Sequence, residues 1–299
     1  MKIEIEEIKK NKTIQKLLEF SIINIDKPSG PTSFNVSDFV RKTLKDLGIR
    51  KTSHFGTLDP KVTGVLPIAL NRACKLTGYF LGENKEYFGI MKVHEDVSIK
   101  EIEKAIKEKF LGKIIQKPPK KSRVKRQERQ REIKLFELLE KNKNEILFKT
   151  EVQGGTYIRK LVHDLGEYMK IGMHMLELRR VRAGIFSEED KNYPSVNLYD
   201  LEKAVEEFKN GNEEFLRKIL IPGEIISELH EAVEIKSNSV KQTLTGKPIY
   251  YKDLKNEIRM QKDEIICVFS DEIFIGVYKV VNENEIFAKA DFVLQDVNN

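Results

Sequence analysis

One stretch of the sequence places a carboxylate where it could serve as a nucleophile. Asp59 stands between Leu58 and Pro60 in a run with few polar neighbours, and Gly56 and Gly64 bracket it. Proline at 60 disfavours the helical conformation at Asp59, so the carboxylate is presented from an extended, rigid loop. The glycines let another segment or a ligand approach closely. Such a carboxylate can act in nucleophilic catalysis, although the same pattern also fits a turn that merely shapes the loop.

The usual motifs of cofactor chemistry are missing from the sequence. It contains no Walker-type loop, no GxGxxG, no HExxH and no GxSxG. Its five histidines lack the spacing of metal ligands, and the two cysteines, Cys74 and Cys267, are too far apart and too few for a zinc site or a disulfide framework. The histidines are therefore expected to be structural, and the sequence offers no recognisable metal or cofactor site.

A mixture of strands and helices must position the Asp59 loop. Alternating or compact apolar runs predict strands, and apolar residues at helical spacing predict helices. Strands are predicted at 21–25, 65–70, 87–93, 133–139 and 145–152, and helices at 34–44, 99–110 and 156–169. This order is not a regular alternation of strand and helix, so it predicts an α+β fold rather than a doubly wound sheet.

The length and spacing of the apolar segments change near residue 226. Short apolar segments bounded by turn residues follow, which is typical of a small β-barrel. They occupy residues 233–235, 249–251, 265–269, 273–280 and 286–290. We therefore expect an N-terminal extension over residues 1–20, a main domain over 21–226 and a small barrel domain over 227–299.

The positive charge of the chain is concentrated in one segment. The net charge is +6. Residues 117–134 hold nine basic and only two acidic residues. A basic, arginine-rich loop suits contact with phosphates, although a solvated surface loop is the alternative. The candidate RNA-binding residues in it are Arg123, Lys125, Arg126, Arg129 and Arg131.

Other features indicate a soluble protein of a reducing compartment. No apolar run approaches the ~18 residues of a membrane span. The N-terminus is charged throughout and has no apolar core of a secretory signal. We expect a cytoplasmic protein with no membrane partner.

Five collinear blocks resemble the TruB/dyskerin family of RNA pseudouridine synthases. The segment HFGTLDPKVTGVLPIAL is similar to the catalytic motif of that family, and the run after Asp59 is most like the archaeal enzyme of H/ACA ribonucleoproteins. The other four blocks are DKPSGPTS at 26–33, KEY at 85–87, GTYIR at 155–159 and LRRVRAGIF at 178–186. The resemblance implies a mixed, largely antiparallel catalytic domain that isomerises uridine to pseudouridine in RNA. It also implies that no metal and no organic cofactor is needed, in agreement with the missing motifs.

The resemblance also implies roles for individual residues. Asp59 would be the nucleophile, Tyr87 would stack on the flipped base, Arg159 would pair with Asp59 and keep it ionised, and Leu178 would exclude water. The expected substrate-binding residues are His54, Tyr157 and Lys27. Four of these residues also have a purely structural interpretation. Tyr87 could be a core aromatic, Arg159 part of a surface ion pair, Leu178 a packed core residue and His54 a structural histidine.

Phe55 stands where the family usually has a small residue, so we expect it to reshape the mouth of the pocket.

The last segment resembles a PUA domain, a small RNA-binding barrel. Residues 227–299 hold 9 basic and 13 acidic residues, so RNA binding there requires one local face. We expect Lys236, Lys241 and Lys247 to form that face. The resemblance implies a guide RNA, an rRNA or tRNA substrate and three small H/ACA proteins as partners.

Three functions remain open at this point. The first is a guide-dependent pseudouridine synthase, the catalytic subunit of a ribonucleoprotein. The second is a stand-alone tRNA pseudouridine-55 synthase, which would have to grip the tRNA unaided. The third is a non-catalytic RNA-binding scaffold, which would have no need for Asp59, Tyr87 and Arg159 together.

Overall fold

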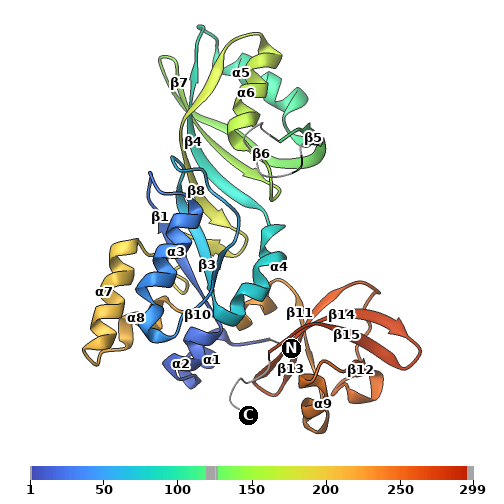
Figure 1. Cartoon of the computed structure of the whole chain (residues 1–299). Coiled ribbons are helices and arrows are strands. Elements are labelled where there is room, and N and C mark those ends of the chain that lie inside the picture. Colours follow the sequence, from blue (N-terminus) through green and yellow to red (C-terminus); the bar gives the residue numbers. More distant parts are fainter. Residues whose placement is uncertain (1, 119–124, 126, 295–299) are drawn as a thin grey trace.

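The computed structural model describes residues 2–118, 125 and 127–294. This part of the chain forms a ten-stranded sheet and a five-stranded sheet, with helices packed around them (Figure 1). In the larger sheet, β3 (Thr63–Leu70) and β8 (Met173–Ala183) run parallel. The remaining strand pairs of that sheet are antiparallel. The predicted α+β class with a mixed, largely antiparallel sheet is confirmed.

The larger sheet brings together strands that are far apart in the sequence. Its order is β10-β1-β3-β8-β4-β7-β6-β5, with β2 on β3 and β9 on β8. The strand after the Asp59 loop, β3, therefore lies one strand away from β4, which carries Tyr87. The strands not yet bounded are β1 (Ser21–Lys27), β2 (Thr52–His54), β4 (Lys85–Val93), β5 (Gly112–Gln116), β6 (Arg129–Asn142), β7 (Glu145–Val152), β9 (Phe186–Ser187) and β10 (Ile221–Pro222).

Two groups of helices lie along this sheet. Helices α5 and α6 lie at the end formed by β5, β6 and β7, whereas α3, α7 and α8 lie beside β1 and β3 (Figure 1). Capping boxes begin α3 at Thr32 and α5 at Ser98. No helix in the described ranges is long and apolar enough to cross a membrane. The helices are α1 (Ile5–Asn11), α2 (Ile14–Glu19), α3 (Ser33–Thr43), α4 (Thr77–Leu81), α5 (Ile99–Lys109), α6 (Ile158–Met169), α7 (Leu198–Lys209), α8 (Glu214–Ile219) and α9 (Val240–Leu244).

The smaller sheet is a curled half-barrel at the C-terminal end of the chain (Figure 1). Its strands coincide with the short apolar segments predicted after residue 226, and α9 packs beside β14. The order is β11-β13-β14-β15-β12. The strands are β11 (Glu231–Glu234), β12 (Ile249–Tyr250), β13 (Ile265–Ser270), β14 (Ile273–Glu283) and β15 (Ile286–Val293).

The first twenty residues, predicted only as an extension, are built into the core as α1 and α2. One apolar cluster contains Ile5 and Ile8 of α1, Phe20 just after α2, and residues of both sheets. The apolar residues of α2 itself pack in the core of the larger sheet. Phe20 is buried between the two sheets, and its ring centroid lies 5.6 Å from that of Phe274 and 6.0 Å from that of Phe292, both in the smaller sheet. The N-terminal segment therefore fastens the smaller sheet to the larger one.

We predict that Phe20→Ala lowers the free energy of unfolding by about 3–5 kcal/mol, because the lost ring leaves a cavity between the sheets. Urea unfolding followed by circular dichroism measures the loss. The matched control is Phe34→Ala, since Phe34 is 72% exposed and its removal is expected to change the stability by less than about 0.5 kcal/mol. Equal losses in the two variants would contradict the role assigned to Phe20.

Candidate active site

The loop that carries Asp59 is held on one side by the start of α3. The Ser33 hydroxyl donates to the Leu58 carbonyl over 3.0 Å and accepts from the Leu58 backbone N–H over 2.8 Å. Ser33 is buried, and the Thr32 cap fixes the turn of helix from which it projects. The residue before Asp59 is therefore fixed by the sequence block at 26–33.

The other side of the loop is held by a buried lysine. The Lys27 ammonium donates to the carbonyls of Pro28, Pro60 and Val62 over 2.7, 3.0 and 2.8 Å. Burial lowers the pKa of Lys27, and the charge of Asp59 opposes that shift. All three ammonium protons are used by the backbone. The structure thus places Lys27, expected to bind substrate, behind the loop as its anchor.

Asp59 and Arg159, which are a hundred residues apart, meet in an ion pair. An Arg159 Nη lies 3.1 Å from Asp59 Oδ2. The side chain of Arg159 is 67% exposed and that of Asp59 is 54% exposed. The pair itself therefore adds little stability, but the carboxylate is both oriented and open to a substrate.

The helix that carries Arg159 is fixed at its first residues by a side chain that the sequence patterns did not single out. Gln116, buried at the end of β5, donates to the Tyr157 carbonyl over 3.3 Å and accepts from the Tyr157 N–H over 3.0 Å. Tyr157 is the N-cap residue of α6 and is half-buried. A lone glutamine before the basic segment carries no recognisable pattern, so sequence reasoning had no signal for it.

Tyr87 and Leu178 lie on neighbouring strands. Tyr87 on β4 pairs with Arg180 on β8, and Gly89 pairs with Leu178. Tyr87 is 7% exposed and Leu178 is 8% exposed, and both belong to the same continuous apolar core as Leu58. An aromatic ring and an apolar side chain that are nearly buried offer little contact to water, and an aromatic face of this kind is suited to stacking.

The residues before Asp59 support the loop. His54 Nε2 lies 3.1 Å from the Thr57 hydroxyl. Burial, together with the charge of Arg180, lowers the pKa of His54, so its imidazole is neutral at neutral pH. Phe55 does not reshape a pocket mouth, contrary to expectation: it is 1% exposed and its ring stacks on Phe80 at 4.7 Å between centroids.

The basic segment is described only in part. Arg123 and Arg126 lie outside the described residues, whereas Lys125 is exposed and Arg129 begins β6. The Arg131 guanidinium lies against Gly155, where an added Cβ would be 3.1 Å from it. Arg131 therefore sits next to the turn that leads into the helix of Arg159.

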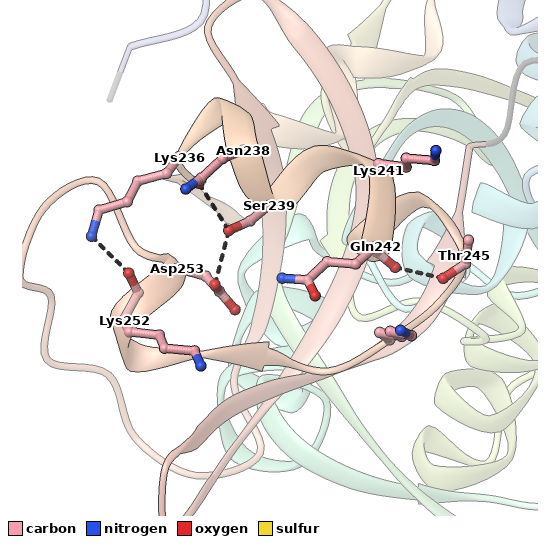
Figure 2. Close-up of a pocket in the computed structure, with 9 residues that line it drawn as sticks. Lys236, Asn238, Ser239, Lys241, Gln242, Thr245, Lys252 and Asp253 are labelled. Atoms are coloured by element: carbon pink, nitrogen blue, oxygen red, sulfur yellow. Dashed lines mark hydrogen bonds between the residues drawn. The ribbon is translucent and has the colours of Figure 1, made fainter.

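The three lysines expected to form an RNA-binding face in the smaller sheet come together. Lys236, Lys241 and Lys247 line one open cavity of about 650 Å³ (Figure 2). Lys252 joins them, and the single carboxylate, Asp253, is buried and already accepts from Ser239 over 2.8 Å. The cavity is therefore positively charged even though the segment as a whole is acidic. Its remaining lining residues are Asn238, Ser239, Gln242 and Thr245.

No group of three or more metal-ligating side chains occurs within the described residues.

Comparison with known families gives two matches along the chain. Residues 42–158 match the model of the TruB family pseudouridylate synthase N-terminal domain. Residues 159–227 match the model of the tRNA pseudouridylate synthase B C-terminal domain.

Curated relatives bear the name "Probable tRNA pseudouridine synthase B". The protein from Nanoarchaeum equitans is 45% identical over 79% of this chain and 66% of its own length. The protein from Methanopyrus kandleri is 40% identical over 89% of this chain and 78% of its own length. The chain thus spans about two thirds to four fifths of these relatives.

Solved structures resemble almost the whole chain. A chain of a Cbf5-Nop10-Gar1 complex is 34% identical, with a TM-score of 0.86 over 95% of this chain and 88% of that one. A chain of an H/ACA ribonucleoprotein bound to a substrate RNA containing 2′-deoxyuridine is 32% identical, with a TM-score of 0.85 over 97% of this chain and 90% of that one.

We predict that Lys27→Met lowers the free energy of unfolding by about 2 kcal/mol or more, because buried carbonyls lose their donor. It should also speed hydrogen exchange of the amides at 58–63. Lys61→Met is the matched control, since Lys61 lies exposed on the same loop and its change should stay within about 0.5 kcal/mol. Unchanged exchange in Lys27→Met would contradict the anchoring role.

Proposed function

Because the chain belongs to the TruB family of pseudouridylate synthases, we propose that it is the catalytic subunit of a guide-RNA-dependent H/ACA ribonucleoprotein. Membership makes it an RNA pseudouridine synthase, which is an isomerase. The proposal concerns the RNA on which it acts, the partners it needs and the residues that do the chemistry.

The reaction rearranges one nucleotide without changing its composition. The bond between N1 of uracil and C1′ of ribose breaks, and a bond between C5 and C1′ forms. The C5 hydrogen leaves as a proton, and N1 gains a proton. No electrons are gained or lost overall, so the enzyme has to supply a nucleophile, proton transfer and a site that holds the detached base.

Asp59 is the proposed nucleophile. Its support is geometric: the loop is tied down on both sides by Ser33 and Lys27, and the exposed carboxylate is oriented by Arg159. A target base inside a helix must first leave its stack to reach such a group, at a cost of a few kcal/mol.

Tyr87 and Leu178 are proposed to enclose the detached base. The ring of Tyr87 offers a face for stacking and its hydroxyl can move a proton. Leu178 closes the apolar side and excludes water. Tyr157 and His54 are proposed to line and support the same site, next to the Arg159 helix and the Asp59 loop, respectively.

The observation that carries guide dependence is the extent of the structural likeness. It covers both sheets, so the lysine-lined cavity of the smaller sheet has a counterpart region in the H/ACA ribonucleoprotein chains. We propose that this cavity grips the guide RNA and that proteins like the Nop10 and Gar1 of the similar complex bind the chain. Arg123, Lys125, Arg126, Arg129 and Arg131 are proposed to contact the RNA.

A stand-alone tRNA pseudouridine-55 synthase is the second candidate, because the curated relatives are named as tRNA enzymes. The two candidates share the chemistry and differ only in what presents the uridine. A scaffold without activity is disfavoured by the intact pairing of Asp59 with Arg159.

We predict that the chain releases tritium from 5-tritiated uridine in an rRNA fragment only when a matching H/ACA guide and the partner proteins are present. Asp59→Asn should lower the rate by at least about 10³-fold, the scale on which loss of a nucleophile acts, and should leave RNA binding unchanged. Release of tritium is followed in parallel from a tRNA transcript without guide. Full-rate release from that tRNA would replace the guide-dependent proposal by the second candidate, and RNA binding with no release from either substrate would support a scaffold.

We further predict that Lys241→Glu combined with Lys247→Glu weakens guide RNA binding at least about tenfold and lowers the salt dependence of the affinity by about one unit of slope per lost phosphate contact. Filter binding at several salt concentrations measures both. Lys262→Glu is the matched control, because Lys262 is exposed on the same domain outside the cavity. Equal weakening in the control would show that only bulk charge matters.

A further inference from the structure

Arg180 is a buried cation that no role proposed so far uses. It lies on β8 between the strand of Tyr87 and the strand that follows the Asp59 loop. Its side chain is 1% exposed. Its Nε donates to the Val65 carbonyl over 2.8 Å, and its Nη2 donates to the Gly56 carbonyl over 3.0 Å. One guanidinium therefore holds the chain just before and just after the Asp59 loop.

The same guanidinium meets the hydroxyl of Tyr87. Tyr87 and Arg180 are directly paired across β4 and β8, so their side chains are cross-strand neighbours, and the buried guanidinium interacts with the Tyr87 hydroxyl. A guanidinium has only donors, so the Tyr87 oxygen is the acceptor in any hydrogen bond between the two groups. In such a bond the O–H proton of Tyr87 is left free to be donated to a base in the site.

Packing around Gly56 keeps this arrangement tight. A Cβ at Gly56 would lie 3.4 Å from Arg180 Nη1 and 3.7 Å from Lys85 Cε. At Gly64 the approach is closer still, since a Cβ there would lie 2.1 Å from the Arg180 carbonyl oxygen. The backbone at both ends of the Asp59 loop therefore packs directly against Arg180.

Burying the charge of Arg180 lowers the stability of the fold, which is unfavourable for a residue with a purely structural role. Within the described part of the chain its guanidinium donates to two carbonyls and is paired with no carboxylate. Lys85 lies buried beside it, and burial together with the charge of Arg180 lowers the pKa of Lys85 to about 8. A buried charge without a counter-ion destabilises a fold, and an apolar side chain would fill the space at lower cost. Such a group is commonly retained for function.

We propose that Arg180 is a positioning residue that orients the Tyr87 hydroxyl toward the target base. Its Nε and Nη2 bonds fix the plane of the guanidinium, so the direction of the remaining N–H groups is fixed as well. Lysine, with a single flexible ammonium, cannot reproduce three fixed directions. The proposal rests on the proposed function of Tyr87.

The test is a double-mutant cycle of Arg180→Met and Tyr87→Phe in the assembled ribonucleoprotein, with single-turnover tritium release at saturating substrate RNA. Arg180→Met should lower the rate at least about 30-fold, and should lower it by less than about threefold when Tyr87→Phe is already present, because coupled residues are not additive. The dissociation constant for substrate RNA should stay within about twofold of wild type, since the lost interaction acts on the reaction step.

Two further variants separate orientation from folding. Arg182→Met is the matched control, because Arg182 lies on the same strand but pairs with Glu86 and Glu151; it should keep wild-type activity. Arg180→Lys keeps a positive charge at this position. If Arg180→Met does not fold, Arg180→Lys takes its place in the cycle. The ¹³Cζ resonance of Tyr87 in tyrosine-labelled protein, assigned by its loss in Tyr87→Phe, should move in the Arg180 variants and stay in Arg182→Met.

The outcomes are distinct. Rate losses that multiply in the double variant, or a Tyr87 resonance that stays in place, would overturn the positioning role while wild type remains active. A wild-type complex that releases no tritium would instead overturn the proposed function, and the role of Arg180 with it.

Discussion

Buried cations that bind backbone carbonyls hold the active-site region together. Lys27 and Arg180 close the Asp59 loop from two sides, and Lys85 ties the end of α4 to β4 through three carbonyls. A cation that is satisfied by carbonyl oxygens leaves nearby carboxylates unpaired. In this arrangement the Asp59 carboxylate pairs with the exposed guanidinium of Arg159, so the group proposed to attack the substrate is held through its backbone and stays accessible through its side chain.

Much of the fold could be predicted because its patterns are local. The alternation at 87–93, the cap at Thr32 and the short segments after residue 226 each correspond to an element of the structure. The Asp59 loop stands out because proline and glycine restrict it in recognisable ways.

Long-range contacts account for what the sequence did not reveal. The side chains of Lys27 and Gln116 form hydrogen bonds with backbone atoms of residues that are distant in the sequence. No rule of residue spacing predicts such contacts. Phe55 was assigned to the wrong surroundings for the same reason, since its partner Phe80 comes from a separate helix. The charged N-terminus concealed the apolar residues of α1 and α2, which become buried only by packing against segments that are distant in the sequence.

The exposed ion pair between Arg159 and Asp59 would become stronger if RNA covered it. In the free protein, water and salt screen the two charges, and the side chains keep much of their freedom. A nucleotide lying over this edge would displace that water, and the attraction between the same two atoms grows as the local dielectric falls. With the proposed function, the substrate would complete its own reaction site, and the proposed nucleophile would become rigid only in the complex with RNA.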